Sequence, residues 1–366
     1  MDFVTVEGRS LRDALKCITP IVERRNTIPI LGTLLLEFNG NALIITGTDL
    51  DMEMRVDIDV IDGDGAWKAC LSADTLSNIA RLSGASPVRI SVEGDKAKLS
   101  VGDGDASYEI PTMPVSDFPL IEATADTVLD RFGNGSISDL LSKVAWCIST
   151  EETRYYLNGV CWQSREDGHV FVATDGHRLS VCRYDQDAVP GINMIIPRKA
   201  VTHVVSHFRG RDVEIFSTSK PLAIDIVSPG RRLRTKLIDG TFPDWTRVVP
   251  KSEALQYKFE ITPAEIDLAV QRAQVFGEAN RAVEIKPKDG KLAVARRSPD
   301  CGTAEIQTSA TWPEGATSFG FNAKYLREVL ATVAGPTELL MQDASAPFMV
   351  ADMDKTMTRV IMPMRV

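Results

Sequence analysis

The chain carries one pattern of apolar residues three times, and this internal repeat constrains its fold more than any other feature. Leu76, Val201 and Leu326 each begin a run in which apolar side chains recur every three or four residues, and successive runs lie 125 residues apart. Such spacing places the apolar side chains on one face of a helix. Because a period of this length matches a small domain rather than a solenoid repeat, three similar domains are predicted.

A second helix is predicted near the start of each repeat. The apolar stripes of these helices begin at Leu11, Leu141 and Ile266, which are 130 and 125 residues apart. Before the third stripe, Thr262 and Glu265 have the spacing of a capping box, in which the two side chains satisfy free backbone N–H groups at a helix start. Each repeat is therefore expected to contain two helices.

Between the predicted helices the apolar residues alternate with polar ones, and many are β-branched, which is typical of strands. Asp49, Asp175 and Asp300 follow such segments at intervals of 126 and 125 residues. Each repeat is thus predicted to be an α+β domain in which two helices pack on a mostly antiparallel sheet. The predicted domains span residues 1–122, 123–252 and 253–366.

The charge balance argues against one way of binding nucleic acid. The 366 residues carry a formal net charge of −9, and the isoelectric point is about 5.2, so a broad basic surface that grips DNA is not expected. The polar faces of the predicted helices still carry many basic side chains, among them Arg12, Lys143, Arg198, Lys199, Arg272 and Arg327. Either these side chains share one basic lining, or they are ordinary solvated helix faces.

Other broad classes find little support. No run of about 18 apolar residues is present, and the first residues do not resemble a secretion signal, so the cytoplasm is the expected location. The six cysteines include no C-x-x-C pair and are expected to be small buried residues. Neither a cofactor nor a metal is expected. His203 and His207 lie one helical turn apart but lack a third ligand, and they fit a solvated helix face.

The segment ATDGHRLS (173–180) gathers polar residues at the end of a predicted strand. Asp175 and His177 have the residue types of an acid–base pair, although no nucleophile elbow or phosphate-binding loop accompanies them. Thr-Asp-Gly is also a common turn sequence, since Gly176 tolerates a positive φ and Asp caps turns. The residues alone therefore leave a hydrolase site and a plain turn both open.

A series of segments along the whole chain resembles the bacterial sliding clamps, the beta-subunit family of the replicative DNA polymerase III. The segments are IPILGTLLLEF (28–38), GTDLDMEM (47–54), TRYYLNGV (153–160), ATDGHRLSVC (173–182), IPRKA (196–200), KLIDGTFPDW (236–245), FNAKYL (321–326) and VIMPMRV (360–366). One of them alone would be a weak signal, but all of them occur in order and at matching spacing.

The resemblance implies a DNA clamp fold and a head-to-tail homodimer that closes a ring of six domains around duplex DNA. Such a protein is a processivity factor and not an enzyme. The implied partners are double-stranded DNA held without sequence preference, the DNA polymerase III alpha subunit, a separate ATP-driven clamp loader, and other polymerases and repair proteins. A clamp paralogue specialised for repair or resistance would carry the same features. A hydrolase using Asp175 and His177 is the rival from another class.

The resemblance also implies a groove that captures a short peptide motif with a glutamine and bulky apolar side chains. The matching positions are Leu157, Thr174, Gly176, His177, Arg178, Leu179, Pro243, Arg247, Val248, Val360, Met362, Pro363, Met364 and Arg365. Two departures weaken the match: DASAPFMV (343–350) resembles the family's loop only loosely, and Trp245 stands where the family has a smaller residue.

Two further sets of residues follow from the resemblance and the repeat. The DNA-contacting set is Arg25, Arg154, Tyr155, Tyr156, Arg198 and Lys199, where the tyrosines are suited to stack on exposed bases. The set expected at the seam between the first domain of one chain and the third of its partner is Ile79, Leu82, Tyr108, Ile110, Val275 and Phe276.

Overall fold

The computed structural model describes residues 2–23, 27–122, 127–218, 222–276, 282–298 and 301–366. The chain forms two compact units, which are Met1–Ser138 with Thr202–Leu237, and Asp139–Val201 with Ile238–Val366. The α+β layout predicted from the repeats, with helices and antiparallel sheets, is confirmed. The boundaries at residues 122 and 252 stay a prediction, because these units divide the central repeat.

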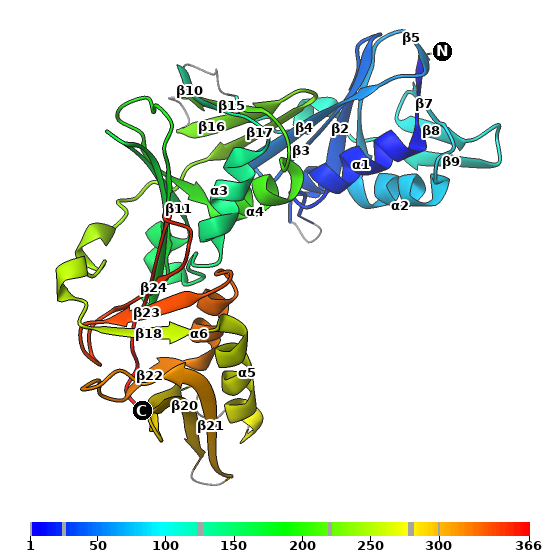
Figure 1. The fold of residues 1–366 in the computed structure, drawn as a ribbon. Coiled ribbons are helices and arrows are strands. Elements are labelled where there is room, and N and C mark those ends of the chain that lie inside the picture. Colours follow the sequence, from blue (N-terminus) through cyan, green and yellow to red (C-terminus); the bar gives the residue numbers. More distant parts are fainter. Residues whose placement is uncertain (1, 24–26, 123–126, 219–221, 277–281, 299–300) are drawn as a thin grey trace. The chain divides into compact units, whose positions relative to one another are not determined.

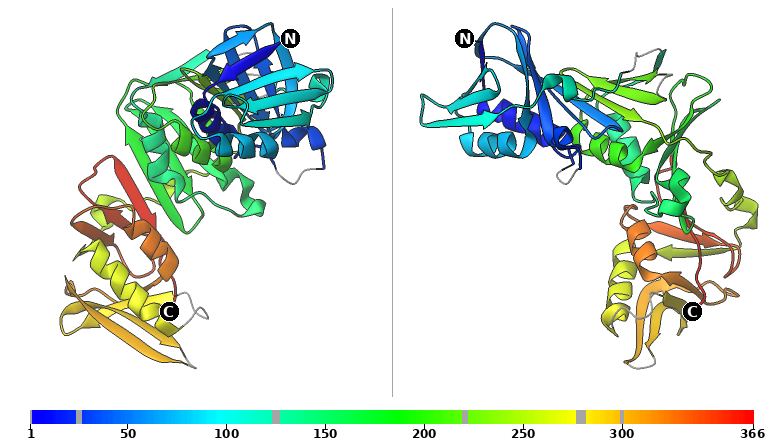
Figure 2. Two further views of the ribbon diagram at one scale, coloured as in Figure 1. Left: turned by 90° about the vertical axis from the view of Figure 1, so that its right-hand side faces the viewer. Right: turned by 180° about the vertical axis from the view of Figure 1, so that it is seen from behind.

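Six α-helices occur at the predicted places among the described residues. They are α1 (Gly8–Ile18), α2 (Ala73–Ser83), α3 (Ser136–Ala145), α4 (Arg198–His207), α5 (Pro263–Ala273) and α6 (Ala323–Leu330). The predicted apolar stripes are buried: Leu11, Leu15 and Ile18 of α1 are at most 2% exposed. Helices α1 and α2 lie side by side in the first unit, as do α5 and α6 in the second (Figures 1 and 2). Amphipathic periodicity in the sequence thus predicted both the positions of the helices and the faces that they bury.

The first unit contains two antiparallel sheets. Five strands follow the order β5 (Asp62–Asp64), β1 (Phe3–Val6), β7 (Val88–Glu93), β8 (Lys96–Val101), β9 (Ala106–Pro111). Eight strands follow the order β10 (Thr127–Phe132), β15 (Val213–Thr218), β16 (Ala223–Ser228), β17 (Arg231–Lys236), β4 (Met52–Asp59), β3 (Ala42–Thr48), β2 (Thr33–Phe38), β6 (Trp67–Ser72).

The second unit also contains two antiparallel sheets. Eight strands follow the order β14 (Asn193–Pro197), β11 (Gly159–Arg165), β12 (Gly168–Thr174), β13 (Arg178–Tyr184), β25 (Met357–Ile361), β24 (Phe348–Ala351), β23 (Thr337–Met341), β18 (Tyr257–Ile261). Four strands follow the order β21 (Gly302–Thr311), β20 (Lys291–Ser298), β19 (Ala282–Lys288), β22 (Phe319–Asn322).

Both eight-stranded sheets run across the boundaries between sequence repeats. Strand β17 of the second repeat pairs with β4 of the first, with Leu233 opposite Met54. Strand β13 of the second repeat pairs with β25 of the third, with Leu179 opposite Val360. Each compact unit therefore owes its continuity to backbone hydrogen bonds between repeats, and the central repeat contributes to both units.

Two local predictions are wrong. Thr262 precedes α5 but makes no side-chain capping bond, and the Glu265 carboxylate instead accepts hydrogen bonds from the backbone N–H and the hydroxyl of Ser309. A neighbouring strand therefore outcompetes the local capping box. Five cysteines are buried as predicted, whereas Cys301 is exposed.

Within the part of the chain that the structure describes, no helix has the length and apolar character needed to cross a membrane.

A buried ion pair joins β16 to β17 in the first unit. Arg234 binds Asp225 through two parallel bonds, Nε–Oδ1 at 2.6 Å and Nη2–Oδ2 at 2.7 Å. Both side chains are at most 5% exposed. A third bond, from Arg234 Nη1 to the backbone oxygen of Ile121 at 2.6 Å, ties the end of the first repeat to this pair. Bidentate geometry offsets part of the cost of burying two charges.

Replacing Arg234 by Met is expected to lower the free energy of unfolding by about 3–5 kcal/mol, because the Asp225 carboxylate is then buried without its counter-charge. Urea unfolding followed by circular dichroism measures this loss. The double variant Arg234→Met/Asp225→Leu, which removes both charges, should lose less than Arg234→Met alone. An unfolding midpoint for Arg234→Met equal to that of the wild type would contradict the role given to this pair.

Candidate functional site

The segment 174–178 forms a tight turn between β12 and β13 in the second unit. Asp175 Oδ1 accepts hydrogen bonds from the backbone N–H groups of His177 and Arg178, each at 2.9 Å. Thr174 Oγ1 donates to the backbone oxygen of Arg178 at 2.6 Å. Gly176 has a φ of +87°, which a side chain rarely permits. Asp175 is therefore a turn-capping residue, and the bonds it accepts are those of a turn rather than of an acid–base pair with the His177 ring.

Arg178 joins this turn to helix α6. Its guanidinium binds the Asp175 carboxylate, with Nη2–Oδ2 at 3.1 Å, and also pairs with Glu328 of α6. It lies over the ring of Tyr325, 4.3 Å from the centroid, and His177 stacks on the same ring with centroids 5.5 Å apart. The Arg178 side chain is only 7% exposed, and its charge is paired with Asp175 and Glu328. These contacts hold the turn against α6.

Arg154 also contacts the turn, at Gly176. Its guanidinium binds the Glu151 carboxylate, with Nη2–Oε2 at 2.6 Å and Nε–Oε2 at 2.9 Å. A Cβ added to Gly176 would lie 2.5 Å from Arg154 Nη1, so the guanidinium rests directly on the glycine. The DNA contact predicted for Arg154 has to compete with both of these contacts.

An apolar cluster forms a floor beside the turn. Leu157, Leu179 and Val360 are at most 3% exposed and pack with Phe242 and Trp245. Around them, the predicted groove positions that retain exposed surface are Gly176, His177, Pro243, Arg247, Val248, Met364 and Arg365, whereas Thr174, Met362 and Pro363 are half-buried and Arg178 is buried. The predicted groove residues therefore divide into buried residues and residues with exposed surface, termed the rim, and their grouping into a peptide-binding groove stays a prediction.

Trp245 is a member of this floor that the sequence reasoning noted only as a departure. It begins the short helical turn η4 (Trp245–Arg247) and is 6% exposed. Its indole N–H donates to Gln163 Oε1 at 3.2 Å, and the guanidinium of Arg165 lies 5.2 Å from its ring centroid. The indole satisfies its one polar group in this way and fills the space under the rim.

The remaining predicted DNA-contacting residues lie in two places. In the turn η3 (Glu152–Leu157), Tyr155 is 53% exposed, whereas Tyr156 is half-buried against the apolar floor. Arg198 and Lys199 are exposed in the first turn of α4. Arg25 lies outside the described residues.

The residues predicted at the seam differ in accessibility. Leu82 and Val275 are 68% and 76% exposed, Tyr108 is half-buried, and Ile79 and Ile110 are buried within the subunit at 4% and 9%. Ile79 belongs to the buried stripe of α2. The side chain of Phe276 lies outside the description. Leu82 and Val275 are thus the seam candidates with most surface available.

The prediction that His203 lies on a solvated helix face is wrong. His203 of α4 is 4% exposed, its Nε2 lies 3.9 Å from Cys17 Sγ of α1, and its ring centroid is 4.5 Å from that of His207. The two helices pack together at this point, which single-chain periodicity does not reveal. Among the described residues no three His, Cys, Asp or Glu side chains are grouped as metal ligands.

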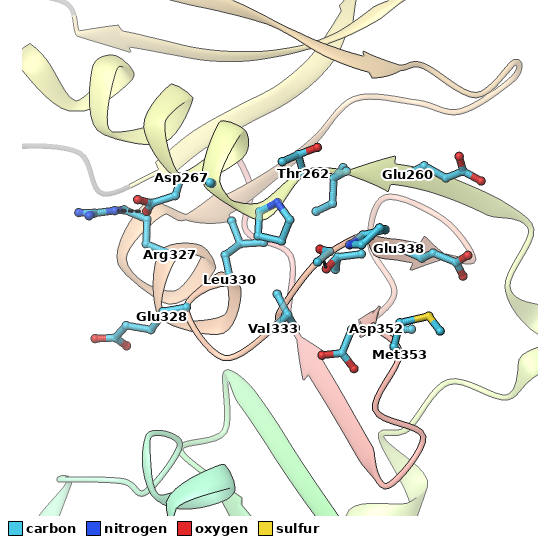
Figure 3. A pocket seen from close by; sticks show the side chains of 18 of the residues that line it. Glu260, Thr262, Asp267, Arg327, Glu328, Leu330, Val333, Glu338, Asp352 and Met353 are labelled. Atoms are coloured by element: carbon cyan, nitrogen blue, oxygen red, sulfur yellow. Dashed lines mark hydrogen bonds and ion pairs between the residues drawn. The ribbon is translucent and has the colours of Figure 1, made fainter.

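A hollow of about 1240 Å³ lies in the third repeat, and none of the predicted groove residues lines it (Figure 3). Leu330 and Val333 line it together with charged side chains from α5, α6 and the strand ends. Arg327 Nε binds Asp267 Oδ1 at 2.6 Å, and Asp352 pairs with Arg359 at 3.2 Å. Sequence reasoning missed this hollow because its lining comes from separate segments, and many of its charges are neutralised by their neighbours.

Comparison with known proteins matches the chain, from its first to its third repeat, to the domains of one family. Three family descriptions match in order: "DNA polymerase III beta subunit, N-terminal domain" over residues 1–122, "central domain" over 133–244 and "C-terminal domain" over 246–365. The chain is 32% identical to the beta sliding clamp of Caulobacter vibrioides, over 99% of this chain and all of that one.

Solved structures agree with this match. A Caulobacter crescentus beta sliding clamp with polyethylene glycol in a putative beta-motif tethering region is 31% identical, with a TM-score of 0.91 over 100% of this chain and 99% of that one. A Bartonella birtlesii sliding clamp bound to griselimycin is 29% identical, with a TM-score of 0.91 over the whole of both chains.

The surroundings of His207 at the end of α4 predict a dependence of stability on pH. Burial, and then the charge of Arg231, lower the pKa of His207, and Arg231 Nη1 also donates to the His207 backbone oxygen at 2.9 Å. A lowered pKa in the folded state means that the unfolded chain binds the proton first as pH falls. The His207 contribution is therefore complete above about pH 6.5 and is lost progressively below it.

Thermal unfolding between about pH 5 and 8 measures this effect. The wild type should lose melting temperature on acidification more steeply than His207→Gln, which has no proton to take up at this position. Parallel pH profiles for the two proteins would contradict the assignment.

Proposed function

The chain belongs to the DNA polymerase III beta subunit family, and from that premise we propose that it works as a sliding clamp, a processivity factor that encircles duplex DNA and tethers a polymerase to it. The observation that carries the proposal is the match of three beta-subunit domains in order along the chain. The full-length likeness to solved sliding clamps, at TM-scores of 0.91, supports it.

Exposed strand edges support a ring built from two copies. Strand β9 ends the first sheet and β21 ends the four-stranded sheet, so each offers backbone groups without a neighbour among the described strands. Pairing β9 of one copy with β21 of its partner, head to tail, would join the sheets, and two such contacts would close the ring. Leu82 and Val275 would supply apolar surface at this seam.

A closed ring suits the charge of this chain. With a net charge of −9 per chain, electrostatic attraction to DNA is weak overall, and contacts to phosphates carry no sequence information. A topological link does not require strong contacts, and weak contacts favour sliding. Arg198 and Lys199 on α4 would then act as local, sequence-neutral contacts, with Tyr155 available to stack on an exposed base.

The groove beside the 174–178 turn would dock partners through a short linear motif. A buried apolar floor accepts bulky side chains, and polar groups of the rim accept a glutamine. Met362 and Met364 suit a site that binds several ligands, because methionine side chains repack easily. The proposed partners are the DNA polymerase III alpha subunit, the clamp loader, and other polymerases and repair proteins.

We propose that the chain is not an enzyme, needs no cofactor and acts in the cytoplasm. The hydrolase alternative finds no support in Asp175, which is bound within its own turn. The nearby thiol of Cys147 is a poor nucleophile, because burial raises its pKa well above the ordinary value.

Sedimentation should give a native mass of twice the chain mass of 40.1 kDa at micromolar concentration. Leu82→Glu should shift the protein toward the monomer, since a charge then replaces apolar surface at the seam. Leu222→Glu is the matched control, because Leu222 is also exposed, at 56%, and lies outside the proposed seam. A monomeric wild type would count against the ring.

Protein loaded by a clamp loader on a nicked circular plasmid should remain bound at about 1 M salt, where electrostatic contacts are screened. Cutting the plasmid should release it, because an open end lets a ring slide off. Equal loss from the circular and the linear DNA would indicate ordinary electrostatic binding.

A further inference from the structure

The last residues of the chain are held at two points in the second unit. After β25 ends at Ile361, the backbone N–H of Met362 donates to the backbone oxygen of His177 at 2.9 Å. Two residues later, the N–H of Met364 donates to the backbone oxygen of Gly320 in β22 at 2.7 Å. The tail, defined as residues 362–366, therefore spans from the 174–178 turn to the four-stranded sheet.

Gly320 provides the space for this tail. A Cβ at position 320 would overlap Val366 Cγ1, lie 2.5 Å from the Met364 backbone oxygen and lie 3.1 Å from Val366 Cγ2. All three nearest atoms thus belong to the tail. The backbone φ of Gly320 is not positive, so the backbone conformation does not require glycine here. Close approach of the tail is the reason for glycine at this position.

The residues on either side of Gly320 fix its orientation. Phe319 and Phe321 are at most 3% exposed, and each packs on Phe348, with ring centroids 4.6 Å and 5.0 Å apart. Successive side chains of a strand point to opposite faces. The two phenylalanines anchor β22 in the core, and position 320 therefore faces the tail.

We propose that Gly320 is a positioning residue for the peptide groove, because it seats the tail that forms one wall of it. This inference rests on the proposed docking function. With Met362 fixed to the turn and Met364 fixed to β22, the side chain of Met364, 42% exposed, is presented in one place before a peptide arrives. A wall ordered in advance reduces the entropy lost on binding.

Gly320→Ala in the full-length chain tests the proposal directly. The added methyl group should displace the tail while β22 keeps its core contacts. The Met364 amide should then exchange its hydrogen faster, and affinity for a synthetic peptide with a glutamine followed by leucine and phenylalanine should fall roughly tenfold, the loss expected for one displaced wall of a groove. Gly32→Ala is the matched control, since nothing lies near a Cβ at that glycine.

A double-mutant cycle separates positioning from a general structural role. In a chain ending at Met362, Gly320→Ala should have no further effect on peptide affinity or melting temperature, because the atoms it displaces are gone. An equal additional loss in the full and shortened chains would overturn the proposal, as would unchanged Met364 exchange. If the wild type binds no peptide although its Met364 amide is protected from exchange, the docking function is rejected, and the positioning role of Gly320 is rejected with it. The contact of the tail with Gly320 would still stand.

Discussion

Strand pairing between sequence repeats is the interaction on which the rest of the structure depends. Backbone bonds of β17 to β4 and of β13 to β25 convert separate repeat sheets into two eight-stranded sheets. The second pairing places Val360 opposite Leu179 in the apolar cluster beneath the proposed groove. It also carries the tail to His177. The proposed groove lies at this junction and therefore needs both repeats in place.

Ion pairs between buried and half-buried side chains reinforce these junctions. Arg234 ties β17 to Asp225 and to the end of the first repeat, and Arg178 ties the turn after β12 to Glu328 of α6. In both cases an arginine from the central repeat binds the backbone or side chain of its neighbour. A guanidinium suits this role because its donors form a planar fork and it also stacks on aromatic rings, as Arg178 does on Tyr325.

The helices, their buried faces and the antiparallel sheets were predictable from the sequence, because periodicity reports burial directly. The turn at 174–178 was predictable from its Thr-Asp-Gly sequence, but the roles of its neighbours were not. Arg178 proved to be engaged with α6, and His203 proved to be buried against α1, because both depend on elements distant in sequence. Glu265 failed as a capping residue for the same reason. Nothing in the local sequence indicated that Gly320 makes room for the tail.

Covalent closure of the proposed seam tests most directly whether DNA is threaded through this protein. In a Cys301→Ser background, which removes the exposed native thiol, Leu82→Cys and Val275→Cys would be joined across the seam by a bismaleimide after loading on a nicked circular plasmid. A threaded duplex should stay linked to the cross-linked protein in denaturing detergent and come free when the plasmid is cut. Release of the intact circle by detergent, with the cross-links formed, would contradict the account.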